Sequence, residues 1–339
     1  MHKRTLTSTA LAALAFLAAH VSAAPSASPG YAVLPFYSHE NPDSIVSFDW
    51  AGAGALYYQT SASYSYGGFH QWSGGTLNTL QTGSGSIANG ASVVTIGDFV
   101  YFNVDTYSST PIRRFGPVSG APVLADISTT TNYALHTDGG NLFITGSVNF
   151  GPTNIYYSAI GGSGNLLSDP AISIGAPGGG SGPLAFDGAG NLFYAPGYFD
   201  KSIYRWSAAD VAAAIANPVG APLSAPGHLW LDYSALYPMQ GGATSMLVDP
   251  AGNLLVTITD FVNPSYLTRF DVAPNGSYAG TREDVLTNNV LIGQLRAHDG
   301  GIYVSSENTI YQIVPEPATG ALVGIGFAAL ALRRGRRRV

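Results

Sequence analysis

Acidic side chains recur at matched places along the chain and together could bind a hard cation. They follow the second strand of several repeated units at Asp105, Asp200, Asp260 and Glu307, with Asn149 in the corresponding region of another unit. Ca²⁺ takes about six to eight oxygen ligands, so loops that share one rim would suit it. The alternative is loop capping, because Asp and Asn side chains bond their own backbone in turns. No tight Asp-x-Asp-x-Asp run is present to favour the cation.

The same loops are rich in aromatic side chains, whose flat faces suit sugar rings. The aromatic positions are Tyr64, Tyr66, Tyr107, Phe150, Tyr198, Phe199 and Phe261. Rings beside Asp and Asn could bind a glycan through its faces and its hydroxyls. Tyrosine is also favoured in β-strands and at wet surfaces in general, so a purely structural role stays open.

Histidines and nucleophiles give weaker signals. His136 and His298 fall at matching places, shortly before Asp138 and Asp299, which favours packing positions over metal ligands. No His-x-x-x-His pair, Gly-x-Ser-x-Gly elbow, Walker loop or dinucleotide fingerprint occurs, and the glycine-rich run 178–182 lacks the helix and lysine of a phosphate loop. The chain has no cysteine, which excludes disulfides, thiol catalysis and thiolate metal sites.

Six copies of one hairpin must position these side chains. In each copy a short strand ends at an Asp, a Gly-rich turn follows, and an apolar strand begins. The turns start at Asp49, Asp98, Asp138, Asp187, Asp249 and Asp299. A further strand recurs about a dozen residues later, at 69–72, 112–115, 155–157, 203–206, 267–270 and 310–313. Repeats of this length indicate an architecture built from equivalent units.

The turn chemistry explains the hairpin. Asp187-Gly188-Ala189-Gly190-Asn191 places an Asp that can bond its own backbone before a Gly that allows positive φ. Four-stranded units repeated six times predict a six-bladed β-propeller. The chain resembles NHL-type and related six-bladed propellers, which share the Asp-x-x-Gly-Asn-Leu turn and a following Arg-containing strand. The resemblance covers about residues 31–313 and implies fold more than activity.

The ends of the repeat array predict how the ring closes. After residues 310–313 the chain runs directly into its C-terminal segment, so the sixth unit lacks an outermost strand. The apolar segment 31–36 precedes the first unit, and we expect it to pair with the sixth blade and hide the open edge. One helix is predicted over 208–216, with Ser207 as N-cap and Pro218 after its end.

The C-terminal 26 residues have three parts. Val314, Pro315, Glu316 and Pro317 come first, and the apolar stretch 318–332 follows. The arginines Arg333, Arg334, Arg336, Arg337 and Arg338 complete the segment. As a helix, 318–332 rises about 22 Å, short of a hydrocarbon core of about 30 Å. The arginines obey the positive-inside rule and can snorkel, so they would keep this end in the cytoplasm and the body outside.

This three-part order resembles the PEP-CTERM sorting signal of Gram-negative bacteria. The resemblance implies that exosortase, a membrane transpeptidase, cuts the chain near 315–317 after a transient inner-membrane stage and transfers the body outward. It also implies a link to exopolysaccharide. A plain tail anchor is the alternative.

The N-terminal residues have the pattern of a secretory signal peptide. Lys3 and Arg4 form a basic region, 11–19 is apolar, and the small residues of 21–23 form a cleavage site. The expected domains are therefore a signal peptide over 1–23, a propeller over 24–313 and a sorting signal over 314–339. Half of the fourteen basic residues lie in the two ends, so the body is strongly acidic and nucleic acid is excluded as an expected partner.

Together these features predict an all-β protein: a six-bladed propeller closed by an N-terminal strand, with a C-terminal transmembrane sorting helix. The function we expect is that of an exported cell-surface or matrix protein. Its propeller would bind a glycan, a cation or another surface protein, with no cofactor except, in one interpretation, Ca²⁺. The alternative is an enzyme of the gluconolactonase or streptogramin-lyase type. Such a site needs convergent acidic, amide or histidine ligands near the axis, and the sequence identifies no such set.

Overall fold

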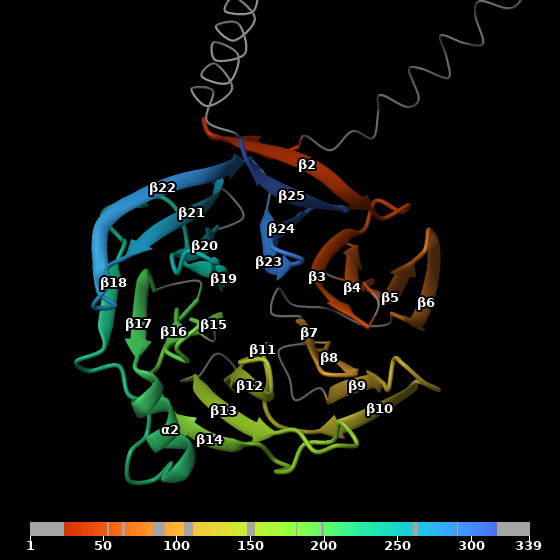
Figure 1. Ribbon diagram of the computed structural model, residues 1–339, viewed down its shortest axis with the longest axis horizontal. Coiled ribbons are helices and arrows are strands. Elements are labelled where there is room, and N and C mark those ends of the chain that lie inside the picture. The colour runs from red at the N-terminus through yellow and green to blue at the C-terminus, as the bar shows by residue number, and fades with distance from the viewer. Residues whose placement is uncertain are drawn as a thin grey trace, which may run out of the picture.

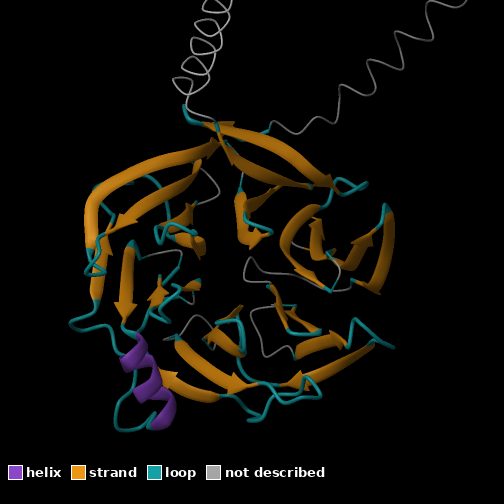
Figure 2. Cartoon of the chain, in the orientation of Figure 1, coloured by secondary structure: helices purple, strands orange, loops and turns teal. Residues whose placement is uncertain are grey.

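Six β-sheets stand around a central axis in the computed structural model, as blades of a propeller (Figure 1). The structure describes residues 24–52, 54–62, 65–83, 92–104, 111–147, 153–180, 182–197, 200–259, 264–289 and 291–316. Within these residues the regular secondary structure is all β-strand apart from a single helix at the outer edge (Figure 2). The predicted all-β six-bladed propeller is therefore confirmed.

The first three blades each contain four consecutive antiparallel strands, ordered from the axis outward. Blade 1 contains β3 (Ser44–Ala51), β4 (Ala55–Ala62), β5 (Ser65–Ser73) and β6 (Thr76–Thr82). Blade 2 contains β7 (Val93–Ile96), β8 (Phe99–Asn103), β9 (Ile112–Gly116) and β10 (Val123–Ser128). Blade 3 contains β11 (Ala134–Thr137), β12 (Asn141–Gly146), β13 (Asn154–Ala159) and β14 (Ile172–Gly175).

The other three blades repeat the plan with additions from elsewhere in the chain. Blade 4 contains β15 (Leu184–Phe186), β16 (Leu192–Tyr194), β17 (Ser202–Trp206) and β18 (Leu229–Asp232). Blade 5 contains β19 (Ala243–Val248), β20 (Leu254–Ile258), β21 (Ser265–Val272) and β22 (Tyr278–Asn288), with β1 (Ser26–Ala27) outside them. Blade 6 contains β23 (Ile292–His298), β24 (Gly301–Ser306), β25 (Thr309–Pro315) and, outermost, β2 (Tyr31–Ser38).

The repeated turn forms by the predicted mechanism. In blade 4 the Asp187 Oδ1 atom accepts hydrogen bonds from the amides of Ala189 and Asn191, both at 2.9 Å. Gly190 between them has a φ of 82°, a conformation that disfavours side chains. Asp249 accepts from the Asn253 amide in the same way at 2.8 Å. Local side-chain chemistry thus sets the hairpin that starts these blades.

Blade 1 departs from this pattern. The repeat placed Asp49 at the start of the turn, but β3 continues to Ala51 and the turn glycines are Gly52 and Gly54. That assignment was wrong, because a Gly-rich stretch follows Asp49 at almost the same spacing as in the other units. Asp49 therefore lies within the innermost strand.

The hydrophobic core lies between neighbouring blades. One cluster joins blades 1 and 2, where the rings of Phe69 and Phe102 stack with centroids 4.0 Å apart. Another joins blades 3 and 4 around the fully buried Trp206, against which Val211 of the helix α2 (Ala208–Ala216) packs. The ring is held by these contacts between sheets, which fix each inner strand at a set distance from the axis.

The ring closes as the sequence predicts. Strand β2 pairs antiparallel with β25 from Ser38 opposite Thr309 to Tyr31 opposite Pro315, with one bulge between Pro35 and Tyr37. We call this pairing the closing seam. Tyr31 and Val33 pack on the cluster between blades 5 and 6, and Tyr37 packs on the cluster between blades 6 and 1. The N-terminal segment is therefore the fourth strand of blade 6.

The helix also matches its prediction. Ser207 caps α2, its Oγ accepting from the Asp210 amide, while the Asp210 carboxylate accepts from the Ser207 amide at 2.9 Å. This capping box starts the helix in the loop between β17 and β18. Among the described residues no helix is long and apolar enough to cross a membrane. The predicted signal peptide over 1–23 and membrane helix over 318–332 lie outside the described residues.

Candidate functional site

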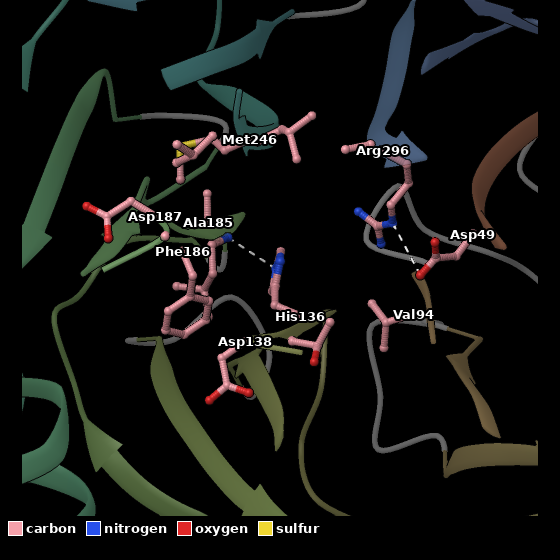
Figure 3. Close-up of a pocket in the computed structure, with 15 residues that line it drawn as sticks. Asp49, Val94, His136, Asp138, Ala185, Phe186, Asp187, Met246 and Arg296 are labelled. Atoms are coloured by element: carbon pink, nitrogen blue, oxygen red, sulfur yellow. Dashed lines mark hydrogen bonds and ion pairs between the residues drawn. The ribbon is translucent and has the colours of Figure 1, made fainter. Parts of the chain in front are cut away.

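A cavity of about 360 Å³ lies in the central channel of the propeller (Figure 3). The innermost strands of all six blades contribute to its wall. Asp138, Asp187 and Gly188, from the first turns of blades 3 and 4, also line it. The mouth of the cavity is therefore at the end of the channel where the innermost strands pass into those turns.

One residue from each blade occupies the same register position in this wall. Each lies directly opposite the second residue of the apolar run in its neighbouring strand. The six are Asp49, Val94, His136, Ala185, Leu247 and Arg296, opposite Tyr57, Tyr101, Phe143, Phe193, Leu255 and Tyr303. We call them the channel ring. Three members are apolar and three are polar, so the symmetry of the repeat is broken by an acid, a base and an imidazole.

Asp49 is held by groups from two blades. Its Oδ1 accepts from the Trp50 amide at 2.9 Å, and its Oδ2 accepts from the Thr95 amide of blade 2 at 2.8 Å. The Arg296 Nε atom lies 3.8 Å from Oδ2, and only 16% of the Asp49 side chain is exposed. Burial raises the pKa of Asp49, while Arg296 and the two amides oppose that shift. The carboxylate is thus compensated by fixed donors.

Arg296 carries the opposite charge beside Asp49, from the neighbouring blade 6. Its Nη1 donates to the Leu295 carbonyl at 3.0 Å, and its Nη2 donates to the Val93 carbonyl of blade 2 at 2.6 Å. Burial lowers the pKa of Arg296, and the Asp49 carboxylate opposes the shift. Figure 3 shows the guanidinium and the carboxylate pointing toward each other. The pair spans blades 6 and 1, and both partners also bind blade 2.

His136 supplies a neutral polar group on the far side of the channel. Its Nε2 lies 3.2 Å from the Leu184 amide and accepts that N–H. Burial lowers its pKa to about 3, with a smaller contribution from the Arg296 charge, so the ring is neutral near pH 7. Because Nε2 accepts, the proton of the neutral imidazole is on Nδ1. His136 is therefore a fixed hydrogen-bond donor.

The two histidines matched in the repeat have different surroundings. His298 stacks on Trp50, with ring centroids 4.5 Å apart and planes 4° from parallel. Its Nε2 lies 3.4 Å from the exposed carboxylate of Asp299. The packing interpretation therefore describes His298. His136 lines the cavity instead, which the sequence comparison of the two positions did not predict.

The predicted acidic rim is only partly described. Asp105 and Asp260, together with Asn149, lie outside the described residues. Asp200 accepts from the Ser202 amide at 2.9 Å, and Glu307 occupies a tight turn with a φ of 49°. Both lie in loops between the second and third strands of their blades. These loops are at the opposite end of the blades from the turns between the first and second strands, which border the cavity. The described residues contain no group of three His, Asp or Glu placed to hold a metal ion, and the calcium rim stays a prediction.

Of the predicted aromatic positions, the structure describes Tyr66. Its ring is buried, 5% exposed, and packs with Val104. The remaining aromatic positions of that prediction lie outside the described residues. The glycan-binding interpretation of these loops is therefore untested.

The first residues of the predicted sorting signal belong to the propeller itself. Val314 and Pro315 are the last residues of β25, and the Glu316 amide donates to the Gly30 carbonyl at 2.8 Å. Pro317 and the arginines from Arg333 to Arg338 lie outside the described residues. The model of the family described as the PEP-CTERM protein-sorting motif matches residues 314–338. The chain carries a PEP-CTERM sorting motif. This motif implies processing by exosortase and export to the cell surface.

Comparison with solved structures supports the fold of the body. A Thermus thermophilus protein described as an oxidoreductase (glucose dehydrogenase) is 14% identical, with a TM-score of 0.53, over 84% of this chain and 100% of that one. Virginiamycin B lyase from Staphylococcus aureus is 8% identical, with a TM-score of 0.49, over 84% and 99%. PQQ-bound aldose sugar dehydrogenase from Streptomyces coelicolor is 13% identical, with a TM-score of 0.49, over 86% and 99%. No curated protein matches the sequence. The likeness to the Thermus protein shows the propeller fold alone.

Proposed function

We propose that this protein is exported, processed by exosortase near residues 315–317, and retained at the cell surface as a binding module. Its ligand is the terminal residue of a neutral glycan, bound in the channel at the level of the channel ring. The observation that carries the ligand is the composition of that ring: an Asp–Arg pair and a neutral histidine set among apolar side chains. The membrane helix over 318–332 serves as the transient anchor before cutting.

The charges at the ring favour a neutral ligand. Asp49 and Arg296 lie 3.8 Å apart and compensate each other, and the His136 ring is uncharged near pH 7. A free anion would have to compete with Asp49 for Arg296. A divalent cation would find a carboxylate already bound by two amides and a guanidinium. Hydroxyl groups avoid both conflicts, because they accept from Arg296 and His136 and donate to Asp49.

The size and the apolar part of the wall fit one sugar ring. The cavity, about 360 Å³, falls at the lower end of the range for small-molecule sites. Val94, Ala185 and Met246 provide apolar surface against which the C–H face of a pyranose can pack. The mouth leads outward past Asp138 and Asp187, so the rest of a glycan chain would stay in solvent. We therefore expect recognition of a chain end.

Binding can be tested with the mature protein and a panel of neutral, anionic and amino glycans. We expect a neutral glycan to bind, and Ala185→Leu to weaken its affinity about tenfold, or about 1.4 kcal/mol, because the larger side chain fills the cavity. Calorimetry measures the affinity, and thermal melting checks that the fold is kept. Ala209→Leu, at an exposed position on α2, is the matched control and should bind normally.

Two results would contradict the proposed binding of a glycan in the channel. Binding that Ala185→Leu leaves unchanged would place the glycan elsewhere on the surface. Turnover of a lactone panel together with a tightly held divalent ion would favour the enzyme of the lactonase or lyase type instead. The same preparation serves both measurements.

Processing is tested separately at the sorting motif. Replacing Glu316 with Ala should leave most of the chain at its precursor mass and in the membrane fraction of the native host. The reason is that Glu316 is the only charged residue between the last strand and the apolar segment. Mass spectrometry of the cell fractions gives the result. Glu40→Ala, at another exposed glutamate, should be processed normally. If the Glu316→Ala protein has the normal mass and location, the proposed processing is wrong and the protein is an ordinary anchored ectodomain.

A further inference from the structure

The sorting motif begins inside a paired strand. Val314 lies opposite Ala32 and Pro315 lies opposite Tyr31 at the end of the closing seam. The Glu316 amide continues this pairing by donating to the Gly30 carbonyl at 2.8 Å. The side chains of Pro315 and Glu316 are exposed, but the backbone from 314 to 316 lies against the N-terminal segment. The first half of the motif is therefore part of the folded body.

The partner of this backbone is firmly anchored. The Tyr31 hydroxyl donates to Glu283 at 2.8 Å and accepts from Arg269 at 2.7 Å, and Arg269 and Glu283 form an ion pair at 3.1 Å. Burial and the bond to Glu283 raise the pKa of Tyr31 to about 12, so the hydroxyl keeps its proton. The short strand β1 adds pairing with β22 just before. The end of β2 is thus fixed to blade 5 and cannot easily move with the motif.

An enzyme that cuts a peptide bond binds its substrate as an extended chain through backbone groups. At residues 314–316, strand β2 already lies against one edge of that chain. Residues 314–316 lie at the end of the seam, and strand ends open more easily than strand interiors, so they can separate locally while the blade stays folded. The enzyme and β2 therefore need the same segment.

We propose that β2 competes with the processing enzyme, and that cutting occurs on propellers in which residues 314–316 have separated from residues 30–32. This inference rests on the proposed processing by exosortase. It makes the closing seam a determinant of processing rate. The side chains that anchor Tyr31 act on a cut site they do not touch.

The chain offers a clean test because it contains no cysteine. Ala32 and Val314 lie directly opposite each other, and such antiparallel pairs have Cα atoms about 4.5–5.5 Å apart, within the range of a disulfide. The Ala32→Cys/Val314→Cys chain would hold the motif against β2 after export. The Ser38→Cys/Thr309→Cys chain would link the other end of the same two strands and leave the motif end free.

Pulse-chase labelling in the native host measures conversion of precursor to processed protein. We expect the Ala32→Cys/Val314→Cys chain to convert at least about tenfold more slowly when oxidised and to recover when dithiothreitol is added. Recovery on reduction separates the link from any effect of replacing Val314. The Ser38→Cys/Thr309→Cys chain should convert normally. Gel mobility with and without reductant shows that each disulfide has formed.

A second variant, which needs no cysteine, tests whether weakening the anchor of β2 speeds conversion. Tyr31→Phe removes the hydroxyl that joins β2 to Glu283 and Arg269, and we expect faster conversion. Tyr37→Phe is the matched control, because the Tyr37 hydroxyl also makes a hydrogen bond, 2.7 Å to Tyr58, but at the far end of the strand. Normal conversion of the oxidised Ala32→Cys/Val314→Cys chain, or slower conversion of Tyr31→Phe, would overturn the competition. Failure of the unsubstituted chain to convert would instead refute processing itself.

Discussion

Deleting residues 25–38 should lower the melting temperature by about 10 °C or more, or prevent recovery of folded protein. The deletion removes β2, which supplies the outermost strand of blade 6 and covers β25 along its length. It also removes Tyr31, Val33 and Tyr37 from the two clusters that flank that blade. The exposed edge of β25 would then be free to pair with other chains.

The size of this effect follows from what the strand contributes. Burying a large apolar side chain is worth about 1.5–3 kcal/mol, and three partly buried side chains are lost along with the seam hydrogen bonds. A loss on the order of 5 kcal/mol is a large part of the stability of an ordinary domain. Deleting only residues 24–27, which removes β1, is the control and should have a much smaller effect. Equal melting of the 25–38 deletion and the full chain would mean that β2 does not close the ring.

The fold was predictable because its information is local and repeated. The turn at Asp187 combines an acceptor, a glycine and an Asn within five residues, and the same chemistry recurs at Asp249. The helix begins directly after Ser207 because this N-cap Ser and Asp210 stand three residues apart and form a capping box. Even closure could be inferred, since an unused apolar segment and an incomplete last unit occur in one chain.

The channel ring was harder to predict because it exists only after closure. Asp49, His136 and Arg296 lie in three different blades, and no local spacing connects them. Asp49 was also assigned to a turn, since the glycines after it resemble the repeat. The three polar members could have been found by aligning the six units on the first apolar residue of their second strand, such as Leu142 or Leu192. The residue that follows it in each unit pairs with the channel ring residue of the innermost strand.

The Asp49–Arg296 ion pair should contribute more to the free energy of unfolding than the other contacts in the channel ring. Replacing Arg296 with Met should reduce the free energy of unfolding by about 3–5 kcal/mol, because Asp49 would remain buried without its counter-charge. Asp49 is only 16% exposed, so water cannot replace the guanidinium. Burial already raises the pKa of Asp49, and loss of Arg296 would raise it further and favour protonation. Urea denaturation at pH 7 measures the loss.

A double variant separates the lost charge from the lost contacts. Asp49→Asn/Arg296→Met should recover part of the stability, because no charge stays buried, although the single Asn carbonyl oxygen accepts from only one of the Trp50 and Thr95 amides. Arg113→Met is the matched control, since Arg113 and Asp126 pair at 2.9 Å with side chains 24% and 61% exposed. That exposed pair should contribute only about 0–1 kcal/mol. If the double variant is no more stable than Arg296→Met alone, the carboxylate is not the source of the cost, and the methylene stem of Arg296 must be supporting the channel wall through packing.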